Sequence, residues 1–261
     1  MGTQFDDTTT VVRVPGDAGQ AEFAAELDPA WGSLLGLHGG YVAAVAVRAV
    51  QEAFPDREVR TVTTSFLRPA QAGSARVTVS AIRSGRSFTT AVARVSQGGR
   101  DALSVRATLL VPVAAAAWAT PVPEQPPSLD ACVPFTRFSI GHFSRADFRI
   151  DPATVPASDG SEARVAGYIR PLEDREIDAP WLIMAGDFFP PSAFRRVAPP
   201  AGGVSIDYTI HLHQAAPDPG QWLAGVFSCL NNTGGIALEH GTLATPGGAI
   251  VAETFQTRWT G

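Results

Sequence analysis

One order of predicted elements, an apolar helix followed by four long strands, occurs twice in this chain and limits its fold more than any other feature. In the first half, residues from Tyr41 to Val50 are apolar on nearly every side, which indicates a helix buried on most faces, and Pro55 ends it. A short strand is predicted before this helix at 22–31. Glycines separate the strand-like runs that follow it, at 59–67, 73–83, 87–97 and 102–112.

The second half repeats this order. Asp178 is the predicted N-cap of a helix that reaches Phe189, with Pro180 in its first turn, and Pro190 and Pro191 end it. Two strand-like runs precede this helix, at 138–150 and 162–172. Four follow it, at 203–213, 222–230, 235–244 and 248–258.

A long antiparallel sheet curled around one apolar helix fits each half, because the helix then fills the concave face of the sheet. Two such units can join their sheets edge to edge, which also covers exposed strand edges. We therefore predict an α+β fold with two repeats of a sheet wrapped around a buried helix. The alternative is a pair of unrelated α+β domains whose elements follow the same order by coincidence.

The composition divides the chain near its middle. Residues 113–134 contain a run of alanines and several prolines, and such a segment cannot continue a helix or a central strand. We predict an N-terminal domain at 1–112, a Pro/Ala-rich linker at 113–134 and a C-terminal domain at 135–261.

The charge and composition exclude several classes of function. Hydrophobic residues make up 45% of the 261 residues, enough for a sizeable core, and the net charge of −5 gives no field that would hold nucleic acid or an anionic membrane. All 20 basic residues are arginine, so a lysine Schiff base or a P-loop lysine is excluded. Cys132 and Cys229 lie far apart, which predicts neither a zinc site nor a disulfide framework.

The sequence suggests no secretory or membrane address. Residues 1–19 are polar and acidic, unlike a signal peptide, and the longest apolar run, Leu109 to Ala119, is too short to cross a bilayer and contains Pro112. We therefore expect a cytoplasmic protein.

Several short motifs occur in a characteristic order. His38-Gly39-Gly40-Tyr41 opens the first helix, and residues 64–70 (TSFLRPA) and 84–88 (SGRSF) follow it. In the second half come residues 205–213 (SIDYTIHLH) and 251–256 (VAETFQ). These motifs resemble those of the TesB-type acyl-CoA thioesterases, from about residue 22 to the C-terminus apart from the linker.

The resemblance implies a double hotdog fold and hydrolysis of acyl-CoA without a metal, a cofactor or a covalent acyl-enzyme. In that family an aspartate, a threonine or serine, and a glutamine orient the attacking water. Asp207 and Gln256 match the first and last of these positions. The middle position falls on Leu230 when counted forward from Trp222, and on Ser228 when counted back from Gly235; Ser228 is the one with suitable chemistry.

The chemistry of the two matched residues fits these roles. On the predicted strand Asp207, Thr209 and His211 share one face, opposite Tyr208 and its apolar neighbours, and a carboxylate within hydrogen-bond reach of a water can activate it. Gln256 has no titrating group, so it can hold a water or polarise a carbonyl but cannot act as a base. The alternatives are a solvated outer face for Asp207 and a surface amide for Gln256.

The start of the first helix is a second candidate region. Gly39 and Gly40 allow a ligand to approach the backbone, and first-turn N–H groups have no partner within the helix, so they suit the oxyanion that forms when a thioester carbonyl is attacked. We expect His38 and Tyr41 to take part in substrate binding there, with helix capping or packing as the alternative for His38. Asp187, near the end of the second helix, could also reach into a cleft.

The same residues also bear on other functions. His211 and His213 lie two apart on a strand, but no further ligand stands at a suitable spacing, so we predict no metal site. A hotdog dehydratase or hydratase would need His38, His211 or His213 in a catalytic pair. A catalytically silent protein that binds an acyl thioester or another apolar metabolite is the third possibility. We expect an acyl-CoA or acyl-carrier thioester as substrate, and the pairing of double hotdogs in related proteins suggests a homo-oligomer.

Overall fold

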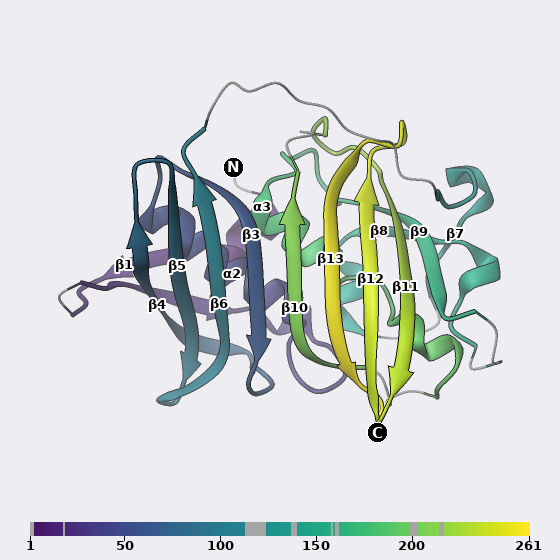
Figure 1. Cartoon of the computed structure of the whole chain (residues 1–261), viewed down its shortest axis with the longest axis horizontal. Coiled ribbons are helices and arrows are strands. Elements are labelled where there is room, and N and C mark those ends of the chain that lie inside the picture. Colours follow the sequence, from purple (N-terminus) through teal and green to yellow (C-terminus); the bar gives the residue numbers. More distant parts are fainter. Residues whose placement is uncertain are drawn as a thin grey trace.

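The strands form one antiparallel sheet of two joined halves (Figure 1). The computed structural model describes residues 3–17, 19–112, 124–136, 140–157, 159, 162–198, 203–213 and 217–261. In these residues the sheet has 13 strands in the order β1-β2-β4-β5-β6-β3-β10-β13-β12-β11-β9-β8-β7. The first half contains β1 Val11–Val14, β2 Ala21–Leu27, β3 Glu58–Phe66, β4 Gly73–Ser84, β5 Phe88–Gln97 and β6 Arg100–Leu110. The second contains β7 Val133–Pro134, β8 Asp147–Ile150, β9 Arg164–Arg170, β10 Val204–Leu212, β11 Leu223–Thr233, β12 Ile236–Ala244 and β13 Ile250–Trp259.

The two halves meet at strands β3 and β10. These strands pair antiparallel, with Thr63 opposite Thr209 and Ser65 opposite Asp207. Each half is a sheet that curves over one helix, as the repeated order of elements predicts, and together they form the double hotdog fold that the family resemblance implies.

Helix α2 (Gly39–Ala53) fills the first half and helix α3 (Ala179–Gly186) the second. Both begin at a side-chain cap: His38 accepts a hydrogen bond from the Tyr41 N–H, and Asp178 accepts one from the Trp181 N–H. Most residues of both helices are buried, α2 against strands of its own half and against α3. Because each fully buried valine, leucine, isoleucine or methionine contributes roughly 1.5–3 kcal/mol, this packing holds the helices on the concave face.

Two predicted strands are shorter than expected. The strand predicted at 22–31 ends at Leu27, since Asp28 caps the 3₁₀ helix Pro29–Trp31 by accepting a hydrogen bond from the Ala30 N–H. Within 138–150 only β8 is a strand, and it follows the 3₁₀ helix Gly141–Ser144; residues 137–139 are outside the described part. Most of the predicted linker, residues 113–123, is also outside it.

A short helix, α1 (Gln4–Thr9), lies where no element was predicted. Thr3 caps it, and the Asp6 carboxylate binds Arg48 of α2 at 2.6 Å and Arg175, which precedes α3, at 2.7 Å. These ion pairs tie the N-terminal segment to both halves. Among the described residues, none of the helices has the length and apolarity needed to cross a bilayer.

Candidate active site

A cavity of about 260 Å³ lies where the two halves meet. Its walls come from the loop before α2, the end of β3 and the turn after it, the 3₁₀ segment before β8, the residues after α3 and the start of β10. Most of the side chains in these walls are apolar: Leu34, Leu35, Leu37, Val42, Phe66, Leu67, Leu103, Ile140, Phe143, Phe189 and Phe194. The polar side chains in the walls are Ser33, His38, Arg68, His142, Asp187, Ser205 and Arg258.

Asp187 brings a carboxylate into this cavity from the C-terminal end of α3. Its side chain is only 7% exposed. Oδ2 accepts a hydrogen bond of 2.8 Å from the Gly40 N–H, in the first turn of α2, where the positive end of the helix dipole favours an anion. A Cβ atom at Gly40 would lie 2.8 Å from Asp187 Cβ and 3.1 Å from Met184 O, so only glycine allows the two helices to approach this closely.

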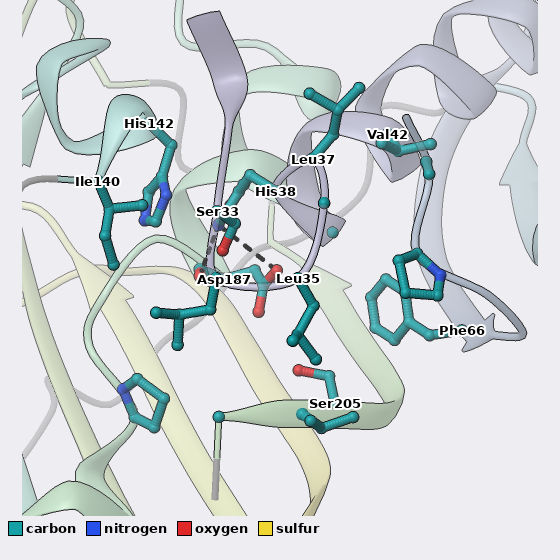
Figure 2. Close-up of a pocket in the computed structure, with 18 of the residues that line it drawn as sticks. Ser33, Leu35, Leu37, His38, Val42, Phe66, Ile140, His142, Asp187 and Ser205 are labelled. Atoms are coloured by element: carbon teal, nitrogen blue, oxygen red, sulfur yellow. Dashed lines mark hydrogen bonds and ion pairs between the residues drawn. The ribbon is translucent and has the colours of Figure 1, made fainter. Parts of the chain in front are cut away.

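Gln256 connects Asp187 to Ser205. Its Nε2 donates to Asp187 Oδ1 at 2.7 Å and to Ser205 Oγ at 2.5 Å. Both acceptors line the cavity, whereas Gln256 itself lies behind them and is buried. Figure 2 shows the Asp187 carboxylate and the Ser205 hydroxyl turned toward each other, with Ile140 on one side of the cavity and Phe66 on the other.

A β-bulge places Ser205 on the inner face of the sheet. Tyr208 and Ile210 of β10 point inward and are buried, in agreement with the predicted alternation. The register with β13 shifts between Ser205 and Asp207, so that Ser205 lies opposite Arg258 on the inner face while Ile206 is exposed.

The structure places the sequence-predicted residues Asp207 and Ser228 outside the cavity. Asp207 lies between Ser65 and Thr257 on the opposite face of the sheet from Tyr208. Ser228 follows the inward-facing Phe227 on β11 and lies opposite His240, and Leu230 is 59% exposed. None of the three contributes to the cavity walls.

The four candidate residues at the start of α2, which are residues 38–41, do not all reach the cavity. His38 and Gly39 line the cavity, and Gly40 reaches it only through its hydrogen bond to Asp187. The Tyr41 ring stacks on Trp31 and its hydroxyl donates to Thr8 O, away from the cavity; burial raises the pKa of this phenol to about 12. Tyr41 therefore packs the helix against the N-terminal segment.

Two stacked histidines, His38 and His142, lie beside Asp187 with their ring centroids 4.5 Å apart. His38 Nδ1 accepts from the Tyr41 N–H at 3.2 Å, so Nε2 carries the proton and donates to Asp187 O at 2.9 Å. His142 Nδ1 donates to Gly32 O at 3.3 Å. Burial, and secondly the neighbouring His38, lower the pKa of His142 well below its ordinary value.

We expect His142 to make the protein less stable in mild acid. Above the ordinary histidine pKa of about 6.5, both the folded and the unfolded chain carry the neutral ring. Below it, the unfolded chain takes up a proton that the folded chain does not. The free energy of unfolding therefore decreases as the pH is lowered. His142→Phe should therefore lose less stability than the wild type between about pH 7 and pH 5, as measured by chemical denaturation. Equal losses in both proteins would contradict this assignment.

The other histidine pair lies on the outer face of the sheet. His213 Nε2 is 3.3 Å from Glu253 Oε2, and His211 Nδ1 is 3.4 Å from Thr61 Oγ1. In the part of the chain that the structure describes, no three His, Cys, Asp or Glu side chains are arranged to hold a metal ion.

Two of the residues at the site, Asp187 and Ser205, had only weak signals in the sequence. Asp187 is the one charged residue between an apolar helix and the segment Phe-Phe-Pro-Pro. The last three residues of this segment, 189–191, line the cavity. Ser205 lies two positions before Asp207 in the very segment that carries the family resemblance. The bulge between them has no signal in the sequence, and without it Ser205 would lie on the outer face together with Asp207.

The double hotdog fold, with a buried carboxylate at an apolar cavity, agrees with the thioesterase class that the sequence motifs resemble. Two family models match the chain, the acyl-CoA thioesterase N-terminal domain over residues 27–111 and the acyl-CoA thioesterase C-terminal domain over residues 113–259. The chain belongs to this family of acyl-CoA thioester hydrolases. The comparison with curated proteins gives no match.

Solved structures of similar chains agree with the fold over its full length. A candidate thioesterase II from Thermobifida fusca YX is 26% identical, with 99% of this chain and 98% of that chain covered and a TM-score of 0.85. A hotdog-fold protein from Alicyclobacillus acidocaldarius is 19% identical, with 100% and 99% covered and a TM-score of 0.84. The tesB protein of Mycobacterium avium subs paratuberculosis is 21% identical, with 98% of each chain covered and a TM-score of 0.76.

Proposed function

We propose that Asp187, Ser205 and Gln256 position the water that hydrolyses an acyl-CoA thioester in this cavity. The observation that carries the proposal is that one nitrogen, Gln256 Nε2, donates to both Asp187 and Ser205, and that both acceptors line the cavity. The family resemblance implies an aspartate, a threonine or serine, and a glutamine. These three residues supply that set at one place, with Asp187 and Ser205 in the roles that the sequence motifs suggest for Asp207 and Ser228.

The carboxylate of Asp187 acts as the base in this proposal. Each of its oxygens accepts one hydrogen bond from the protein, which leaves lone pairs for a water. As the water oxygen bonds to the thioester carbonyl carbon, a water proton passes to Asp187. The tetrahedral intermediate then collapses with cleavage of the C–S bond, and the proton returns from Asp187 to the thiolate of coenzyme A. The products are the free acid and the thiol.

The N-terminus of α2 is suited to stabilise the intermediate. Of its first N–H groups, that of Gly40 donates to Asp187 and that of Tyr41 to His38. Gly39 lines the cavity, and its N–H, at the positive end of the helix, is the donor that we assign to the oxyanion.

The contacts of His38 argue against its use as the catalytic histidine of a dehydratase. A dehydratase needs a histidine nitrogen that exchanges a proton with the substrate, but both ring nitrogens of His38 already bind protein groups. His211 and His213 lie on the outer face of the sheet, away from the cavity.

The experiment that tests this function measures free thiol released from a series of acyl-CoAs of increasing chain length. We expect hydrolysis of at least one of them, and a loss of about 10–100-fold in kcat for Ser205→Ala, which removes one polar contact to the reacting groups. Ser228→Ala is the comparison, because Ser228 lies on the other face of the sheet.

The two serine variants also distinguish the competing assignments. A loss in Ser228→Ala with normal activity in Ser205→Ala would support the position counted from the sequence and contradict ours. A folded wild-type protein that releases no thiol from any acyl-CoA would contradict the function itself.

A further inference from the structure

A buried ion pair borders the proposed site, with Arg258 in the cavity wall and Glu239 behind it. Arg258 on β13 and Glu239 on β12 have side chains that are 5% and 4% exposed, and Glu239 Oε1 lies 2.9 Å from Arg258 Nε and 2.8 Å from Nη2. A buried pair of this kind often contributes little to stability, because desolvation of two charges offsets their attraction. Its contacts with the site therefore suggest another role.

Arg258 determines which way the Gln256 amide points. Arg258 Nη2 donates to Gln256 Oε1 at 2.6 Å, from two positions further along the same face of β13. On the other side of the amide, Nε2 donates to the Asp187 carboxylate. A flipped amide would turn its oxygen toward the carboxylate and its NH₂ group toward the guanidinium, and both contacts would be repulsive.

Arg258 also sets the direction of the Ser205 hydroxyl. Ser205 Oγ accepts from Gln256 Nε2 at 2.5 Å and from Arg258 Nη1 at 3.2 Å. A hydroxyl oxygen has two lone pairs and one proton, so both lone pairs are taken and the proton remains to be donated. Because Ser205 lines the cavity, this proton is available to the water or to the thioester carbonyl.

Glu239 holds the guanidinium in place and connects it to the cavity wall. Its second oxygen, Oε2, accepts from the Ser192 N–H at 2.6 Å and from the Ser192 hydroxyl at 2.5 Å. Ser192 opens the 3₁₀ helix Ser192–Arg195, directly after Pro190 and Pro191 of the wall. Glu239 thus holds Ser192 at the cavity wall, and Arg258 holds the polar side chains of Gln256 and Ser205.

We propose that Arg258, oriented by Glu239, is a positioning residue that makes Gln256 a donor to Asp187 and makes Ser205 a donor to the substrate or the water. This inference rests on the proposed thioesterase function. Arg258 Nη2 lies 3.9 Å from Asp187 Oδ1, beyond hydrogen-bond distance, but binds Gln256 Oε1 at 2.6 Å, so we expect it to act chiefly through Gln256. Its loss should then lower kcat more than it raises KM, and it should leave little for a second change at Gln256 to remove.

The test is a mutant cycle on acyl-CoA hydrolysis. Arg258→Met alone would leave Glu239 buried and unpaired, so the variant used is Arg258→Met with Glu239→Gln, which removes both charges at similar volume. We expect this pair variant and Gln256→Ala each to lower kcat by about 10–100-fold. The variant with all three changes should have a kcat within a few-fold of that of the less active of these two variants. Arg106→Met, at an exposed arginine on the outer face, is the control for loss of an arginine.

The outcomes separate the two proposals. Multiplied losses in the combined variant, or a change in KM alone, would overturn the positioning role while wild-type hydrolysis still supported the function. Absence of hydrolysis in the wild type would overturn the function first. Far-ultraviolet circular dichroism and thermal unfolding of each variant show that the comparison is made between folded proteins.

Discussion

Asp187→Asn is expected to lower kcat for acyl-CoA hydrolysis by about 10²–10⁴-fold, the contribution usual for a positioned base. The amide has nearly the shape of the carboxylate, so the packing at the end of α3 should persist. It lacks the negative charge that takes up the water proton, however, and its NH₂ group would face either the Gly40 N–H or the Gln256 amide. Steady-state rates of thiol release measure the effect.

Asp207→Asn is the matched comparison for this prediction. Asp207 lies on the outer face, opposite Ser65 and Thr257, and we expect its variant to keep activity within a few-fold of the wild type. If Asp207→Asn were inactive and Asp187→Asn active, the carboxylate suggested by the sequence motif would be the base, and the site proposed at the cavity would be wrong.

The fold was predictable from local pattern. A helix that is apolar on all sides has to be covered, and long strands with alternating residues such as Tyr208, Ile210 and Leu212 form a sheet with one covered face. These signals extend over many residues, so small errors at the ends, as at 28–31, do not change the architecture. The short helix α1 gave no such signal, because its stability comes from contacts of Asp6 with distant arginines.

The site was harder to predict because single positions decide it. Gln256 could be taken from its motif, and it is buried at the site. Ser205 and Asp207, however, would share the outer face of a regular strand, and the bulge between them turns Ser205 alone to the inner face, because an extra residue reverses the alternation before it. Asp187 meets Gly40 across 147 residues of sequence, a contact that follows from the packing of α2 against α3 and not from any local pattern.

The largest loss of stability should come from Phe188→Ala. Phe188 follows Asp187 directly, is fully buried and makes edge-to-face contacts with His38, His142, Phe143 and Phe148 at centroid distances of 5.4–6.1 Å. His38 belongs to the first half and the other three rings to the second, so truncation would leave a cavity at the join between them. We expect a loss of about 3–5 kcal/mol in the free energy of unfolding, measured by urea denaturation.

Phe255→Ala is the control, because it removes the same side chain from the outer face of the sheet. Phe255 is 40% exposed and its ring contacts His240. Its removal should therefore change the free energy of unfolding by only about 0.5–1 kcal/mol. Similar losses in the two variants would mean that the aromatic cluster around Phe188 does not hold the halves together. A large loss in Phe188→Ala alone, with reduced kcat in the folded fraction, would show that the packing that joins the halves also holds Asp187 in the cavity.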